Sequence, residues 1–333
     1  MESMKNKALL DEIKTRLTGN KETDVSILHE ELRKYQSQNN FQMAYQIQLL
    51  LFNYLSPEEK AKLNEGAASM IRDHKAKYEK AQELLNFGEL EKAKKILIEL
   101  FDIYEKAGKL DGANFYDFSE PIELFVYAIN LKDIVVKKLP EPVVYYAYQI
   151  ASIYLEQNDV DNAIVYLEKA LLFNPICQYV LQELIERLVS VERYEDAYKY
   201  ILRMLKYAYT KKQLAHAYKM LGIYFKQIKK YDIAVASLAV SNLYVEDLEN
   251  KIKIKEIIDL VGPIRFSSSD ELLSLFKREN INYGPSKEVI GVLKTYVQKA
   301  KERKDYKTLQ YVLNIAVDLT DEEYFKKELE SIK

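Results

Sequence analysis

Residues 147–175 read AYQIASIYLEQNDVDNAIVYLEKALLFNP, and this stretch decides the fold. Apolar residues recur in each half at spacings of three and four, which puts each set on one face of a helix. Asn158 and Asp159 form a polar turn between the halves, and Pro175 ends the second helix. The stretch therefore predicts a helix hairpin over 144–174. The two inward sets are Ile150, Ala151 and Tyr154, then Ala163, Leu167 and Ala170.

The same hairpin recurs along the chain, which is the mark of a repeat protein. Its key small or apolar residue in the second helix falls at 44, 93, 163, 197, 234 and 309. Three consecutive matches are strong, and they span 144–177, 178–211 and 215–248. Degenerate matches span 25–58, 74–107 and 290–323.

The stretch 147–175 resembles a tetratricopeptide repeat (TPR). That family places a small residue in the first helix, an aromatic residue three positions on, alanines in the second helix and a closing proline. The resemblance implies an all-α fold, a right-handed superhelical solenoid of antiparallel helix hairpins, and a bacterial type of TPR protein. The matching residues here are Ala151, Tyr154, Ala163, Ala170 and Pro175.

Two segments depart from the repeat, at 108–141 and 249–289. In the first, we expect a loop over Gly108–Phe118 and one helix over Pro121–Lys137, with Ile122, Phe125, Val126, Ile129 and Ile134 inward. In the second, Ser268 and Glu271 predict the start of a short helix that ends at Arg278. We expect a solenoid over 1–248 and a C-terminal helical subunit over 249–333 that continues the stack; a separate small domain there is the alternative.

The long step between the first two repeats has a clear cause. Ser56 and Pro57, followed by two glutamates, form a strong helix start. We expect one long helix from there, with a single inward face. That face comprises Leu63, Ala67, Met70, Ile71, His74, Tyr78, Ala81 and Leu84.

Composition limits the class of protein. Gly and Pro together number 16 of 333 residues, which is too few for a turn-rich β fold. The 49 Lys and Arg balance 51 Asp and Glu, which argues against a nucleic-acid binder. A single cysteine, Cys177, fits a reducing compartment, and no stretch is typical of a signal peptide or a membrane span. We therefore expect a cytoplasmic protein.

No catalytic motif emerges from the sequence. The three histidines lie far apart and lack a second ligand at helical spacing, so we expect no metal site. No glycine-rich phosphate loop is present, and we expect no cofactor. The chain is therefore predicted not to be an enzyme.

The candidate binding residues lie on the first helix of each strong repeat, opposite the inward face. In the TPR family this stripe lines the concave groove, and tyrosine and mixed charge there suit an extended peptide or a partner helix. The alternative is that the tyrosines only cover neighbouring repeats. The predicted partner-binding residues are Tyr145, Tyr148, Gln149, Tyr179, Gln182, Glu183, His216, Lys219 and Lys226.

Around these residues the stripe also takes in Ser152, Glu156, Glu186, Met220 and Ile223. The set departs from the Lys, Asn and Arg with which some family members hold a C-terminal carboxylate, so we do not expect chaperone-tail binding. Lys219 and Lys226 would favour acidic ligand residues.

The sequence thus predicts an interaction scaffold that holds a protein or an extended peptide without catalysis. A peptide-sensing regulatory protein is one alternative. An RNA-binding solenoid that uses the basic and aromatic stretch 193–230 is another. The net charge of −6 over 141–192 and +8 over 193–230 also leaves end-to-end self-association open.

Overall fold

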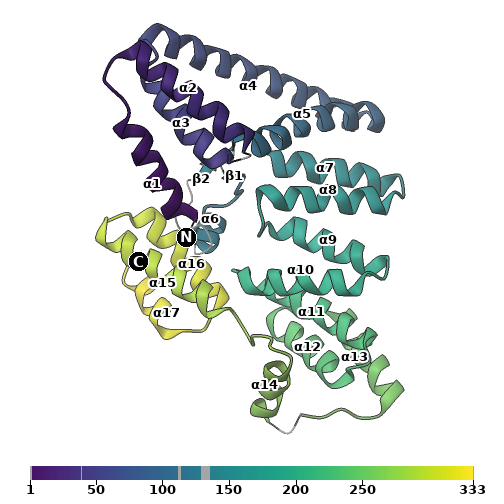
Figure 1. The fold of residues 1–333 in the computed structure, drawn as a ribbon. Helices are drawn as coiled ribbons and strands as arrows, with labels where there is room; N and C mark the ends of the chain where they lie inside the picture. Colours follow the sequence, from purple (N-terminus) through teal and green to yellow (C-terminus); the bar gives the residue numbers. More distant parts are fainter. Residues whose placement is uncertain (1, 39, 112–113, 129–135, 267, 333) are drawn as a thin grey trace. The chain divides into compact units, whose positions relative to one another are not determined.

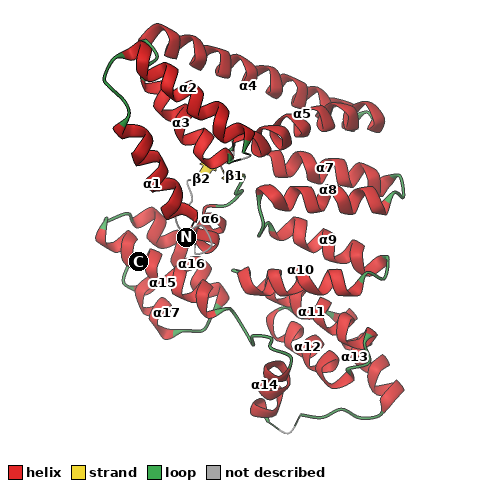
Figure 2. Cartoon of the chain, viewed as in Figure 1, coloured by secondary structure: helices red, strands yellow, loops and turns green. Residues whose placement is uncertain are grey.

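The structure is a computed structural model that describes residues 2–38, 40–111, 114–128, 136–266 and 268–332. Helices make up most of it (Figure 2). The chain divides into two compact units, each discontinuous in sequence. Unit 1 is Met1–Phe118 with Leu131–Asn174, and unit 2 is Ser119–Asn130 with Pro175–Lys333. Position 248, the expected end of the solenoid, lies inside unit 2.

Unit 1 is a set of stacked helices with a short pair of strands (Figure 1). Helix α2 packs on α3, α4 on α5, and α7 on α8, while α5 also packs on α3 and α7. The elements are α1 (Glu2–Thr15), α2 (Lys21–Ser37), α3 (Phe41–Asn53), α4 (Pro57–Asn86), α5 (Leu90–Asp111), β1 (Asn114–Tyr116), β2 (Val136–Lys138), α7 (Val143–Glu156) and α8 (Val160–Phe173).

Unit 2 continues the same construction. Helix α9 packs on α10, α11 on α12, and α15 on α16, while α13 and α14 both pack on α12. The elements are α6 (Pro121–Tyr127), α9 (Gln178–Ser190), α10 (Tyr194–Tyr207), α11 (Lys211–Gln227), α12 (Tyr231–Tyr244), α13 (Leu248–Val261), α14 (Ser269–Arg278), α15 (Lys287–Glu302), α16 (Tyr306–Leu319) and α17 (Glu323–Glu330).

One turn geometry recurs in five hairpins. A residue with positive φ ends the first helix, and the next amide donates to the carbonyl five residues back at 2.8–2.9 Å. This is the Schellman arrangement, which satisfies the last carbonyls of a helix. Each turn residue precedes the key position of the second helix by five, so the repeat spacing seen in the sequence is the spacing of this turn. The turn residues are Gly88, Asn158, Glu192, Lys229 and Lys304.

Small residues allow the paired helices to approach. Ala163, Ala197 and Ala234 are fully buried. At Gly222 a Cβ atom would lie 2.5 Å from Cγ of Leu238, so α11 and α12 touch there at a distance that a side chain would prevent. The strong repeats are therefore held by backbone proximity as well as by apolar side chains.

The segment 108–141 differs from the prediction. Helix α5 runs on through Gly108 to Asp111, and the helix expected over 121–137 ends at Tyr127. Asn114–Tyr116 pairs in parallel with Val136–Lys138, where β-branched Val136 suits a strand. Ile122 and Val126 are buried as expected. Ile129 and Ile134 lie outside the described residues.

Helix α4 begins as predicted but buries less of its face than expected. The Ser56 side chain accepts from the Glu59 amide, and the Glu59 side chain accepts from the Ser56 amide, which is a full capping box. However, Leu63 is 56% exposed and Met70 45% exposed, and burial begins only at His74. Helix α4 has 30 residues and its hairpin partner α5 only 22, so about the first eight residues of α4, which include Leu63, extend past that partner.

Helix α6 packs on the C-terminal helices of unit 2. The rings of Phe125 and Tyr296 are stacked with centroids 3.7 Å apart, and the Tyr311 hydroxyl lies 3.5 Å from Glu120. The short helix from the irregular segment thus covers α15 and α16, which follow it by more than 150 residues. Helix α14 begins at Ser269, and Ser268 is its N-cap as predicted, with the Glu271 amide donating to the Ser268 hydroxyl.

Candidate functional site

The α7 face of unit 1 carries a hollow of about 390 Å³. Its walls come from the α4–α5 turn and from the outward stripe of α7. Five of the six α7 residues that line it belong to the stripe identified in the sequence, and the sixth is Ile153. The lining residues are Leu85, Gly88, Leu90, Tyr145, Tyr148, Gln149, Ser152, Ile153 and Glu156.

Two tyrosines dominate the rim of this hollow. Tyr145 is 42% exposed, and its ring lies nearly parallel to that of Tyr148, with centroids 6.4 Å apart and an interplanar angle of 15°. The Ser152 hydroxyl donates back to the Tyr148 carbonyl. The pair therefore offers an accessible aromatic surface beside polar groups.

Gln149 is engaged across the hairpins. Its side-chain amide and that of Gln82 in α4 exchange two hydrogen bonds, of 3.0 and 3.1 Å. This reciprocal pair joins α7 to α4. Gln149 therefore fixes one wall of the hollow as well as lining it.

A buried polar cluster includes side chains of α4, α5 and α7. Tyr146 donates to the buried carboxylate of Glu141 at 2.6 Å and packs against Tyr78. Burial raises the pKa of Tyr78 to about 12. Next to this, the Tyr104 hydroxyl lies 3.1 Å from Nδ1 of His74. Sequence reasoning placed Tyr78 and His74 on the inward face but did not link them to the tyrosines of α5 and α7, because the contacts join separate repeats.

The corresponding stripe on α9, in unit 2, is mostly self-paired. Gln182 donates to Glu186, and Glu183 forms an ion pair with Arg187 at 3.0 Å. Tyr179 remains 37% exposed. Of the predicted α9 residues, Tyr179 is therefore the one that offers contact area.

On α11 the predicted lysines are bound to the next helix of the stack. Lys219 lies 2.9 Å from Asp247 and 2.5 Å from Glu249, and Lys226 lies 2.7 Å from Glu256. Hydrogen bonds from Lys219 and Lys253 lower the pKa of Glu249 to about 2. Burial opposes the charge on Lys219, but its two carboxylate partners raise its pKa overall.

His216 completes the α11 stripe. Its Nε2 lies 3.8 Å from a Glu186 oxygen. Burial lowers the pKa of His216 more than Glu186 raises it, so the imidazole is neutral at neutral pH. Met220, expected on the stripe, is buried.

Half of the bases in the stretch 193–230 are neutralised. Five of its ten bases form ion pairs with acids, namely Arg193, Lys199, Lys219, Lys226 and Lys230. For three of those five residues the partner acids lie within 247–279, outside the stretch 193–230 whose net charge is +8. The free positive charge is therefore smaller than the sequence suggested.

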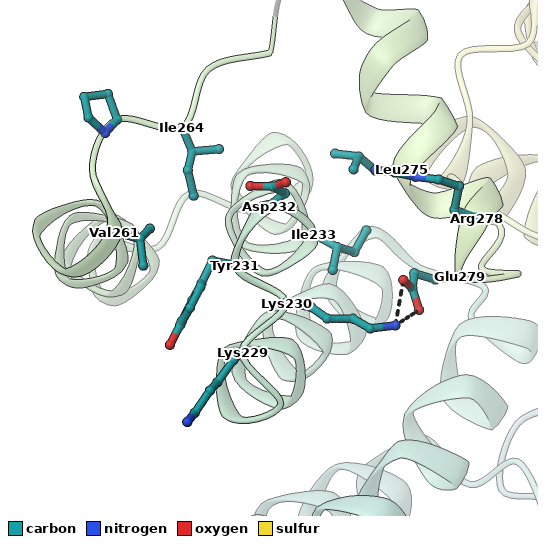
Figure 3. Close-up of a pocket in the computed structure, with 11 residues that line it drawn as sticks. Lys229, Lys230, Tyr231, Asp232, Ile233, Val261, Ile264, Leu275, Arg278 and Glu279 are labelled. Carbon is teal, nitrogen blue, oxygen red and sulfur yellow. Dashed lines mark hydrogen bonds and ion pairs between the residues drawn. The ribbon is translucent and has the colours of Figure 1, made fainter.

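Unit 2 also has two adjoining hollows of about 590 and 540 Å³. They lie where the end of α13, the start of α12 and α14 meet, and Figure 3 shows Asp232 and Ile233 between Ile264 on one side and Leu275 with Arg278 on the other. Lys230 and Glu279 close one edge with an ion pair of 2.7 Å. The sequence analysis did not identify these hollows.

Comparison with known proteins finds solved structures that are similar to this chain at low identity. No protein-family model and no protein of curated function matches the chain. The structure of PilF from Pseudomonas aeruginosa is 16% identical, with a TM-score of 0.37, and the match covers 78% of this chain and 97% of that one. A tetratricopeptide repeat protein from Parabacteroides merdae is 12% identical, with a TM-score of 0.39, over 92% and 98% of the two chains.

The described chain is almost entirely helical, and each unit is built of stacked antiparallel helix hairpins, which the recurring turn and the helix pairs define. Likenesses at this level of identity carry no information on function. Among the described residues, no helix is both long and apolar enough to cross a membrane. In the same part of the chain, no three His, Cys, Asp or Glu side chains are grouped as metal ligands would be.

Proposed function

We propose that this chain is a protein-interaction scaffold, and that the α7 face of unit 1 binds an extended peptide segment of a partner protein. The observation that carries the proposal is the hollow beside Tyr145 and Tyr148, lined by residues of the stripe that the repeat pattern selects. Binding rests on shape and side-chain complementarity, and no chemical step is involved. The single cysteine, buried Cys177, fits a cytoplasmic protein.

The chemistry of the face supports a peptide ligand. Tyr145, which is 42% exposed, contributes a large aromatic contact area to such a ligand. Ser152 and Glu156 add a hydroxyl and a carboxylate beside the aromatic pair. Leu85 and Leu90 supply an apolar wall for a ligand side chain.

Tyr179 on α9 is a second candidate contact, within unit 2. Lys219 and Lys226, by contrast, would have to give up carboxylate partners before they could select an acidic ligand. We therefore assign the binding chiefly to the tyrosine positions.

The test uses the full chain and a display library of random octapeptides. Peptides enriched on the immobilised wild-type protein are synthesised, and their Kd values are measured by fluorescence polarisation. Replacing both Tyr145 and Tyr148 by Ala should weaken binding by about thirtyfold, since loss of a buried aromatic anchor costs roughly 2 kcal/mol. The matched control replaces Tyr306 and Tyr324, exposed tyrosines of α16 and α17.

Wild-type affinity in the control and loss in the α7 variant support the proposal. Equal affinity in both variants, with thermal melting unchanged, would show that the enriched peptides bind elsewhere. The α7 face would then not be the binding site of these peptides.

A further inference from the structure

Helix α13 lacks the second helix of its hairpin. Gly262 ends it with a φ of 91°, and Pro263 follows at once, so the chain leaves in an extended form over 262–266. Because proline lacks an amide hydrogen and favours extended backbone before it, no helix starts there after a short turn. Leu260 at 64% exposed and Val261 at 45% exposed mark the uncovered end of α13.

Helix α14 does not replace the missing helix. It packs on α12, with Leu275 and Phe276 buried, and leaves the two adjoining hollows between itself and the end of α13. The floor is buried Ile233 with Asp232, and the extended segment with Pro263 and Ile264 forms one wall (Figure 3). Five residues line both hollows, so they form one elongated depression. The shared residues are Asp232, Pro263, Ile264, Leu275 and Arg278.

The charges around this depression are unbalanced. Lys230 is neutralised by Glu279. Arg265 and Arg278 line the depression and form no ion pair with any other described residue. Lys229, at the rim, likewise forms no ion pair with a described residue. Three carboxylates line the depression, Asp232, Glu271 and Glu279, against the four cationic side chains. Cationic side chains therefore exceed carboxylates, beside an apolar floor and wall.

We propose that this depression binds an acidic segment of a partner protein that carries at least one large apolar side chain. Arg265 and Arg278 receive the carboxylates, because guanidinium groups pair with carboxylates through two parallel hydrogen bonds. The apolar side chain packs against Ile264 and Leu275, where the second helix of a complete hairpin would have covered apolar surface. The site lies wholly in unit 2 and is independent of the α7 face.

The test compares two octapeptide display libraries on the full chain. One contains only Asp, Glu, Leu, Ile and Gly, and the other replaces Asp and Glu by Lys and Arg. We expect the acidic library alone to yield enriched peptides. Their Kd should rise about tenfold or more in a variant with Arg265→Glu and Arg278→Glu, since both the attraction and the hydrogen bonds are lost.

The matched control carries Lys212→Glu and Lys307→Glu, two exposed lysines elsewhere in unit 2 with the same change of net charge. Its Kd should stay within about twofold, because distant surface charges are screened by salt. A second variant, Arg265→Met with Arg278→Met, keeps the aliphatic stems and serves if the glutamate variant unfolds.

Three results would overturn the inference. The first is enrichment of basic peptides in place of acidic ones, and the second is unchanged Kd in both arginine variants. The third is that a twelve-nucleotide uridine oligomer binds and displaces the enriched peptides with the same dependence on both arginines, which would assign the depression to RNA. Peptides that lose affinity only when Tyr145 and Tyr148 are replaced would support the α7 face and contradict this site.

Discussion

The α7 face of unit 1 and the α11 stripe of unit 2 occupy the same position in their repeats, yet one is open and the other closed. On α7, Tyr145 and Tyr148 border a hollow, and Gln149 bonds to Gln82 of another repeat. On α11, Lys219 and Lys226 both reach carboxylates of the α13 region. The stripe opposite the core therefore borders an open hollow in one repeat and forms ion pairs between repeats in the other.

The difference depends on the residues of the neighbouring repeat. Lys219 and Lys226 on α11 reach carboxylates in and just before α13, because both helices pack on α12. The tyrosines on α7 line a hollow together with the α4–α5 turn, where Gly88 has no side chain to fill it. A stripe position in a repeat protein therefore indicates function only after its counterpart in the next repeat has been checked.

The largest effect is expected at Gly222, which lets α11 approach α12. Gly222→Val places methyl groups against Leu238 and should destabilise the protein by about 1–3 kcal/mol through overpacking. Gly66→Val in the exposed half of α4 meets no atom within 4 Å and is the control, expected within about 0.5 kcal/mol of wild type. Urea denaturation followed by circular dichroism measures both. Equal stabilities would mean that α11 and α12 do not approach closely.

The second largest effect is expected on peptide affinity, which distinguishes the α7 face from the α11 stripe. Lys219→Met with Lys226→Met should change the affinity of an enriched peptide by less than about threefold, whereas the change at Tyr145 and Tyr148 should cost about 2 kcal/mol. The lysines are already paired, so their removal takes little from a ligand. A larger loss from the lysine variant than from the tyrosine variant would reverse the comparison.

A smaller effect is expected on stability when the α11–α13 pairs are broken. Lys219→Met removes the partner of two partly exposed carboxylates and should cost about 1 kcal/mol or less. The measurement is urea denaturation at low and at high salt, and the difference from wild type should shrink as salt rises. A difference that is independent of salt would show that Lys219 contributes by packing.

The smallest effect is a pH dependence. The folded pKa of Glu249 is about 2, below its usual 4.5, so its pairing stabilises the protein above pH 4.5 and is lost as pH falls towards 2. Glu249→Gln should flatten that part of the stability curve, by about 1 kcal/mol or less because the side chain is half exposed. Thermal melting between pH 5 and pH 2 measures it, and identical curves would contradict the pairing.

Most of the helices could be predicted because each repeat carries a local signal. The small residue of the second helix, the polar turn and the apolar spacing are all short-range, and the structure has a hairpin at each expected position. The helix expected over 121–137 was wrong because Val136 joins a strand whose partner, Asn114, is far away in sequence. Periodicity does not report such pairing.

The candidate site was only partly predictable for the same reason. The stripe on α7 follows from helix geometry, and it lines a hollow. That Lys219 and Lys226 are paired could not be read from the sequence, because it depends on which carboxylates of 247–256 lie opposite them. The exposure of Leu63 likewise depends on where α5 ends.

Hydroxyl-radical footprinting of the full chain, with and without a peptide enriched from the random library, tests the central claim most directly. The account predicts that oxidation of Tyr145 and Tyr148 falls when the peptide is bound, while oxidation of His216, on the α11 stripe, does not change. Protection of His216 with unchanged oxidation of both tyrosines would contradict it.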